Sequence, residues 1–174
     1  MNGADGSPDR EHLLDSLMSI SRALIAITVR SLAAAGAELT FPQYRILVVL
    51  AGRGPQRTID LAVEQAVRPS TISRACDRLI RRGLVSRYQA PPDRRVAWLA
   101  LTEAGRELIG EVMRHRRDEF DRLIATVEIP HVPAAAAVIE ALARATGEPD
   151  EAEWWRRWAA AAGGPDRCRP EYAS

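Results

Sequence analysis

The sequence lacks lysine and has only two cysteines, and these absences narrow its possible chemistry. All 24 cationic residues are arginine, which we attribute to coding bias rather than to function. Cys76 and Cys168 are far apart and follow no disulfide or metal-binding spacing. The three histidines, His12, His115 and His131, do not complete a metal site with them. We therefore expect no metal and no other cofactor.

Motifs for catalysis, secretion and membrane insertion are also missing. The chain has no nucleophile elbow, Walker loop or dinucleotide-binding glycine motif, so we expect no enzyme. Its N-terminus, MNGADGSPDREH, lacks the basic and apolar regions of a signal peptide. No apolar run approaches the ~20 residues of a membrane span. We therefore expect a cytoplasmic protein of about one domain, with no membrane partner.

What the sequence does contain is a local excess of positive charge. Between Arg68 and Arg95 there are eight arginines and two acids, Asp77 and Asp93, which gives +6. The rest of the chain must then carry −5, since the net charge is +1. This concentration coincides with helix, turn and hairpin signals and requires a cause.

The spacing of apolar residues predicts a mainly α protein with one small β-hairpin. Thr40, Thr58 and Thr102 are predicted helix caps, and Gly83 is predicted to follow a helix end. The predicted helices span about 10–35, 40–52, 59–66, 69–82, 103–128, 134–146 and 151–162, and the predicted strands span 84–89 and 96–101.

The first predicted helix has an apolar face too wide for packing on one side only. Leu13, Leu17 and Ile20 belong to one stripe, while Leu14 and Met18 belong to a neighbouring one. Two interpretations stay open. It is either a core helix or a helix shared between the core and a subunit interface.

Helices 59–66 and 69–82 are joined by a turn of about three residues, which is the spacing of a helix-turn-helix. In such motifs the second helix enters the DNA major groove. One side of it, with Ile72, Cys76 and Leu79, is predicted to pack in the core. The other side carries hydroxyls and arginines that are suited to phosphates and base edges. The alternative is a basic face with no role in DNA binding.

The predicted hairpin tip, with Asp93, Arg94 and Arg95, forms a second basic segment. A hairpin after a recognition helix makes a winged helix, and an arginine on the wing is attracted to a narrow A·T-rich minor groove. The candidate DNA-binding residues are Arg68, Ser70, Thr71, Ser73, Arg74, Arg78, Arg94 and Arg95.

From about Leu39 to Leu108 the chain resembles the MarR-type winged-helix transcriptional regulators. The matching segments are LTFPQYRILVVL, the pair Leu61-Ala62, PSTISRACDRLIRRGLV, and the wing form Asp-x-Arg followed by a strand and Leu-Thr-x-x-Gly. Each fragment alone is a weak signal, but the combination is specific.

The resemblance implies an obligate homodimer whose N- and C-terminal helices interlock. It implies that Arg95 enters the minor groove and that Asp93 stabilises the wing through a salt bridge. It also implies release from DNA by a small, often aromatic, ligand held between the two regions. On this basis residues 1–38 form an N-terminal dimerisation helix, 39–102 the DNA-binding domain, and 103–174 the C-terminal dimerisation helices with a flexible tail.

The chain departs from the family pattern at two places near the turn. Gln65-Ala66 stands where many relatives have Leu-Gly, so the turn is less clearly specified. Arg68 stands where a Ser or Asp cap is usual, and it cannot accept the free N–H groups. Either Ser70 shifts the cap, or Arg68 gives up helix stability for a phosphate contact.

Several other residues have two interpretations. Cys76 is either a buried structural thiol or a redox switch in the recognition helix, and Cys168 is either an inert or a reactive tail thiol. His115 belongs to a solvated or interfacial patch or has a ligand role, and Tyr44 packs in the core or lines an effector pocket. The three C-terminal tryptophans, Trp154, Trp155 and Trp158, either pack against the dimer or contribute to an aromatic ligand site.

We therefore predict a sequence-specific DNA-binding regulator, most simply a repressor, acting as a homodimer on a pseudo-palindromic operator. Its predicted partners are double-stranded DNA, a second copy of itself and a small effector whose identity the sequence does not reveal. The alternatives are an architectural DNA-binding protein without effector and a winged-helix module for protein contacts.

Overall fold

The computed structural model describes residues 7–89 and 96–161, which form a mostly helical chain with one small sheet. Its elements are, in chain order, α1 (Pro8–Ala34), α2 (Phe41–Arg53), β1 (Gln56–Arg57), α3 (Thr58–Glu64), α4 (Pro69–Arg81), β2 (Val85–Gln89), β3 (Ala97–Leu101), α5 (Glu103–Ala125), α6 (Val132–Ala145) and α7 (Glu151–Ala161). The mainly α fold with a winged helix-turn-helix is confirmed.

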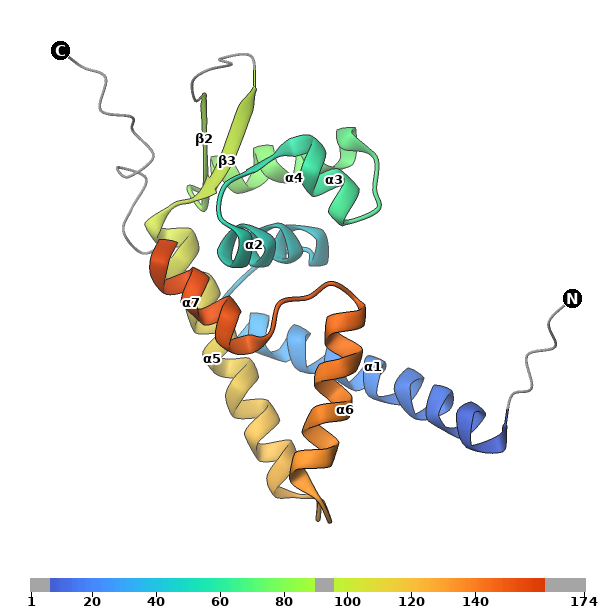
Figure 1. The fold of residues 1–174 in the computed structure, drawn as a ribbon. Helices are drawn as coiled ribbons and strands as arrows, with labels where there is room; N and C mark the ends of the chain where they lie inside the picture. The colour runs from blue at the N-terminus through green and yellow to red at the C-terminus, as the bar shows by residue number, and fades with distance from the viewer. Residues whose placement is uncertain (1–6, 90–95, 162–174) are drawn as a thin grey trace, which may run out of the picture.

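Figure 1 shows two parts of the molecule. Helices α2, α3 and α4 gather beside the sheet, while α1, α5 and α6 extend away from that group, and α1 packs against α5. Helix α7 lies across the start of α5, next to α2. Most of the core lies in the first part, where its largest fully buried side chains include Ile46, Leu47, Leu61, Ile72 and Leu79. The start of α5 adds Ile109 and Val112 to the same core.

The ends of the long helices follow local chemistry. The Thr40 N–H donates to Gln43 Oε1 at 2.9 Å, which is half of the predicted capping box at the start of α2. Thr102 Oγ1 accepts from the Gly105 N–H at 3.1 Å and donates to the Gly83 carbonyl at 2.6 Å. A side chain at Gly105 would meet the Leu84 carbonyl oxygen at 2.1 Å. The start of α5 is therefore locked against the base of the hairpin.

The sheet contains a strand that the sequence analysis did not predict. The order is β1-β3-β2, with both pairings antiparallel, so β3 is central. Gln56 and Arg57 of β1 pair with Leu99 and Trp98 of β3. The predicted cap Thr58 is consequently wrong: Arg57 precedes α3, and Asp60 accepts from the Arg57 N–H at 3.3 Å.

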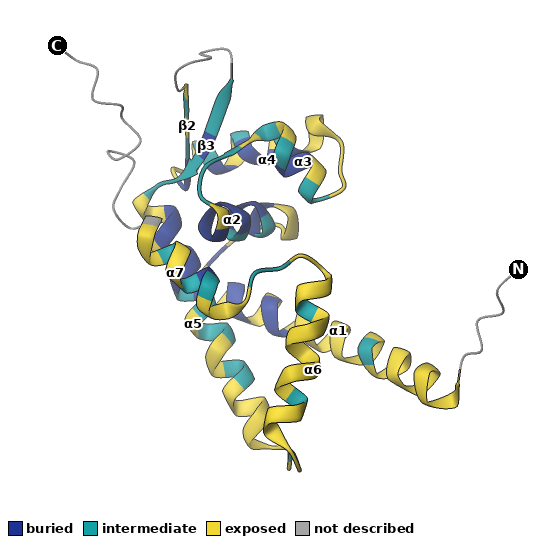
Figure 2. Ribbon diagram, in the orientation of Figure 1, coloured by how far each residue is buried: buried dark blue, intermediate teal, exposed yellow. Residues whose placement is uncertain are grey.

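Helix α1 is not a core helix in this chain. Only Ile27, Thr28, Ser31 and Leu32 near its C-terminus are buried. Most of the remaining apolar side chains are exposed, and Figure 2 colours most of the helix as exposed. By length and mean hydropathy α1 is also long and apolar enough to span a membrane, although polar and charged residues interrupt its apolar sequence.

Candidate nucleic-acid interface

Helix α4 divides into a buried side and an exposed side, as the sequence predicts. Ile72, Ala75, Cys76 and Leu79 are buried, and they attach the helix to the core. The polar side holds the candidate contacts. Of these, Arg68, Ser70, Thr71, Arg74 and Arg78 are exposed and Ser73 is half-buried.

The arginines of the exposed side form no ion pair with another described residue. Arg68, Arg74 and Arg78 have no acidic partner within residues 7–89 and 96–161, although nine arginine–carboxylate pairs exist elsewhere in those ranges. Arg74 and Arg78 are four residues apart on one helix, so their side chains extend from the same face one turn apart. Both guanidinium groups are therefore available to bind an anionic partner.

Of the two acidic residues in this part of the sequence, Asp77 and Asp93, only Asp77 lies within the described residues. Asp77 accepts a hydrogen bond from Arg87 Nη2 of β2 at 2.8 Å, which joins the recognition helix to the first strand of the hairpin. This contact was not predicted, because it joins residues on different elements with no motif spacing. Asp93, Arg94 and Arg95 lie outside the described residues, so their wing roles stay predictions.

The start of α4 has no side-chain cap. Arg68 occupies the N-cap position without a side-chain hydrogen bond, and Pro69 follows at the first helical position. The Thr71 N–H reaches the Arg68 carbonyl at 2.9 Å. A cap shifted to Ser70 is therefore wrong, and the Ser70 N–H stays open to an anion such as a DNA phosphate.

The turn before α4 uses a left-handed residue. Ala66 has φ of 51°, the only positive φ among the described non-glycine residues. Its N–H reaches the Val63 carbonyl at 3.1 Å, and the Val67 N–H reaches the Ala62 carbonyl at 3.1 Å. These are the two hydrogen bonds of a Schellman motif, with alanine where glycine is usual.

Cys76 is part of the core beneath the interface. Its side chain is fully buried, and burial raises the pKa of the Cys76 thiol to about 11. Because the thiolate is the reactive form, the structure favours the structural interpretation over a redox switch.

Tyr44 and Arg116 form a polar contact between α2 and α5. Arg116 Nη1 donates to the Tyr44 hydroxyl at 2.9 Å, and the guanidinium lies 5.6 Å from the centre of the Phe120 ring. Burial raises the pKa of Tyr44, and the charge of Arg116 partly opposes that shift. Tyr44 thus belongs to the core cluster, which agrees with the interpretation that it packs in the core. Its hydroxyl nevertheless lies at a polar contact between α2 and α5.

The three C-terminal tryptophans pack within their own chain. Trp154 is buried in the core cluster, and Trp155 and Trp158 pack against that cluster. The prediction that they pack against the dimer is therefore wrong for Trp154, whose contacts are with α2. His115 lies 3.8 Å from Glu111 on the same helix, and no group of three metal-binding side chains exists among residues 7–89 and 96–161.

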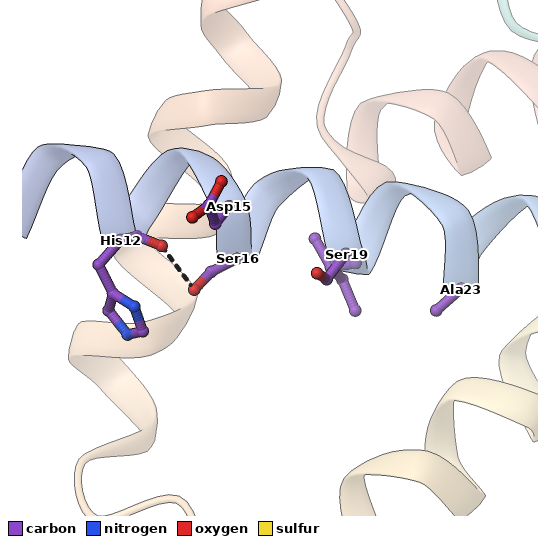
Figure 3. A pocket seen from close by; sticks show the side chains of 6 residues that line it. His12, Asp15, Ser16, Ser19 and Ala23 are labelled. Atoms are coloured by element: carbon purple, nitrogen blue, oxygen red, sulfur yellow. Dashed lines mark hydrogen bonds between the residues drawn. The ribbon is translucent and has the colours of Figure 1, made fainter.

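The surface of α1 carries a shallow hollow of about 570 Å³, lined by His12, Asp15, Ser16, Ser19, Ile20 and Ala23. Figure 3 shows these side chains along one helix, with the Ser16 hydroxyl donating to the His12 carbonyl. Because one helix supplies every lining residue, the hollow does not enclose a small ligand as binding pockets do.

Comparison with known proteins identifies the family. The sequence model of the MarR family matches residues 39–97. The crystal structure of RV1404 from Mycobacterium tuberculosis resembles this chain with a TM-score of 0.76, and the two sequences are 34% identical. The match covers 83% of this chain and 99% of that chain. The chain belongs to the MarR family.

Two relatives from Bacillus subtilis are named as HTH-type transcriptional regulators. The repressor MdtR is 29% identical over 119 residues, 68% of this chain and 76% of that protein. The regulator YhbI is 35% identical over 72 residues, 41% of this chain and 47% of that protein, so the chain spans about half the length of YhbI. NadR in complex with 4-hydroxyphenylacetate shares the MarR fold, at 23% identity and a TM-score of 0.62, over 84% of this chain and 96% of that chain.

Proposed function

We propose that this MarR-family chain is a homodimeric, sequence-specific DNA-binding regulator of the cytoplasm, most simply a repressor. The observation that carries the proposal is the exposed side of α4, where Arg74 and Arg78 form no ion pair with any other described residue. The relatives with the same helix-turn-helix are named as transcriptional regulators or repressors. We propose no catalytic activity.

The chemistry of α4 supports binding in a major groove. Ser70, Thr71 and Ser73 are short, so the helix is able to approach the base pairs closely. Arg74 and Arg78 are long enough to reach guanine edges or phosphates, and arginine binds both in a bidentate manner. Arg68, Arg94 and Arg95 complete the proposed set as phosphate and minor-groove contacts.

Exposed apolar helices support the homodimer. Seven large apolar side chains of α1 are exposed, and α5, the segment after it and α6 add seven more: Leu123, Ile124, Val127, Val132, Val138, Ile139 and Leu142. A patch of this kind on a soluble chain marks an interaction surface. A second copy that covers these helices would place two recognition helices on one duplex, about 34–36 Å apart on successive major grooves.

A small effector is proposed to release the DNA. The contact of Tyr44 with Arg116 lies between α2 and α5, at the junction of the winged helix with the long helices. A ligand that separates this junction would alter the spacing of the two recognition helices. A differential affinity of a few kcal/mol is sufficient for such a shift.

The test is fluorescence anisotropy with the DNA upstream of the chain's own gene and with scrambled DNA, across a salt series. We expect tight, sequence-dependent binding, with log K falling by ~0.9 per phosphate contact against log salt. Arg74→Ala and Arg78→Ala should weaken binding, whereas the matched exposed Arg117→Ala of α5 should not. Equal binding to both DNAs would support the architectural alternative. Binding to neither would contradict the proposal.

A further inference from the structure

Helix α7 returns to the winged helix after the chain has left it. The intervening α6 has no buried residue. In α7, by contrast, Trp154 is only 7% exposed and belongs to the main core. Figure 1 shows α7 lying against α5 and close to α2, and the residues of α7 that are buried or half-buried include Trp154, Trp155 and Trp158. The end of the described chain is thus attached to the part that carries α4.

Two tryptophans of α7 pack against glycines of other helices. A side chain at Gly52 of α2 would meet the Trp154 indole at 2.5 Å, which is too close for any residue other than glycine. A side chain at Gly110 of α5 would meet the Trp158 ring at 3.2 Å. Trp154 and Trp158 stack on each other with ring centres 5.4 Å apart and planes at 19°. One stacked pair therefore contacts both α2 and α5.

A buried arginine fixes the second tryptophan. Arg106 of α5 is 8% exposed, and its Nη2 donates to the Trp158 carbonyl at 2.8 Å. Its guanidinium also lies 4.5 Å from the centre of the Trp158 ring. A buried charge without such partners is costly, so the docked α7 supplies what Arg106 needs. Arg106 is four residues after Thr102, at the junction of the sheet with α5.

The segment that leads into α7 is also attached to the winged helix. Glu148 forms an ion pair with Arg45 of α2, and Arg45 lies 3.6 Å from Glu64 of α3. The space between this segment, α2 and Trp154 is about 10 Å³, which holds no more than about one water molecule. The fit is close where this segment meets α2 and Trp154.

We propose that α7 is a strap that fixes the orientation of the winged helix on α5, with Trp154 and Trp158 as positioning residues for α4. Without the strap, the winged helix is joined to α5 through the hairpin base and the contacts of α2. With it, α2 and α5 are held together by the stacked indoles. The effect on DNA binding rests on the proposed function, while the effect on orientation does not.

The test uses Gly52→Ala, whose added methyl group displaces Trp154. Alanine favours a helix more than glycine does, so a loss of docking would not result from a weaker α2. Trp98→Phe in every variant leaves only the three tryptophans of α7 to fluoresce, because the chain has four. Arg156→Ala, on the exposed side of α7, is the matched control.

Three readouts are compared between the parent and Gly52→Ala. The first is the tryptophan emission, which should shift to longer wavelength as Trp154 becomes hydrated. The second is the distance between spin labels on Val63→Cys in α3 and Arg117→Cys in α5, with Cys168→Ser and dilution by unlabelled chain. Its distribution should broaden. The third is operator affinity, which should fall about fivefold or more. Arg156→Ala should change none of them, and far-UV circular dichroism should stay constant.

The readouts separate the two proposals. An unshifted emission, or a shifted emission with an unchanged label distance, would overturn the strap. A broadened distance with unchanged operator affinity would overturn its role in positioning α4. If the parent binds no DNA, the proposed regulator fails, but the label distance still decides whether the strap exists. Gly110→Ala serves as the second variant in case Gly52→Ala does not fold.

Discussion

Ala66→Gly should stabilise the protein, although it removes a side chain from the helix-turn-helix. Ala66 is exposed, so the loss of its methyl group removes little buried surface. Its φ of 51° is left-handed, where a Cβ atom is strained by its own backbone. Glycine adopts this conformation without that strain.

The magnitude follows from two opposing terms. A left-handed conformation costs an L-residue about 1–2 kcal/mol. Glycine loses about 0.4–1 kcal/mol more than alanine on folding, because its unfolded chain is freer. The expected net gain in the free energy of unfolding is about 0.5–1 kcal/mol. For a chain of this size that corresponds to a Tm increase of about 1–4 °C.

The molecule contains its own controls. Gly83 ends α4 with φ of 70° and the same two hydrogen bonds, from Gly83 to Ile80 at 2.9 Å and from Leu84 to Leu79 at 3.0 Å. No atom lies within 4 Å of its ideal Cβ, so Gly83→Ala tests backbone strain alone and should be destabilising. Ala136→Gly, in the interior of α6, should also be destabilising, by about 1 kcal/mol.

The assay is urea unfolding followed by circular dichroism at 222 nm, with all variants at one protomer concentration because dimer stability depends on it. Ala66→Gly should raise the midpoint, while Gly83→Ala and Ala136→Gly should lower it. If Ala66→Gly lowered the midpoint as Ala136→Gly does, the left-handed turn would be refuted.

Two further predictions concern titratable groups. With Cys168→Ser, the raised pKa of Cys76, about 11, predicts that its thiol reacts far more slowly with a disulfide reagent at pH 8 in the folded protein than in urea; equal rates would contradict its burial. The Arg30 hydrogen bond lowers the pKa of Glu119, with Arg122 adding to the shift. Such a group stabilises the fold above its unfolded pKa, near 4.3, and the contribution is lost as pH falls through the folded pKa. In Arg30→Ala the Glu119 pKa measured by NMR should therefore rise. The difference in stability between Arg30→Ala and the parent should disappear at acid pH. An unchanged Glu119 pKa would disprove the pair.

The sequence was informative wherever one element carries its own pattern. The apolar side of α4 is readable from the spacing of Ile72, Cys76 and Leu79, because a helix repeats every 3.6 residues. The start of α5 is readable from Thr102, because a cap is a local hydrogen bond. The order of the helices and the family follow from such patterns, which is why the fold was predictable.

Features that depend on two distant segments were not predictable. Strand β1 has two residues, too few for any alternation, and it exists because β3 offers it a partner. Trp154 and Trp158 pack against single glycines, Gly52 and Gly110, on two different helices. Nothing in the local sequence shows that these glycines face tryptophans about fifty to a hundred positions away.

The β1 to β3 pairing also has a kinetic consequence. The pairing of β2 with β3 joins segments that are close in the sequence. Pairing of Gln56 with Leu99 instead closes a loop that contains all of α3 and α4. The entropy cost of closing a loop grows with its length, and contacts between distant residues slow folding. Strand β1 should therefore join the sheet only after the helix-turn-helix has formed, as a late step in the folding of this chain.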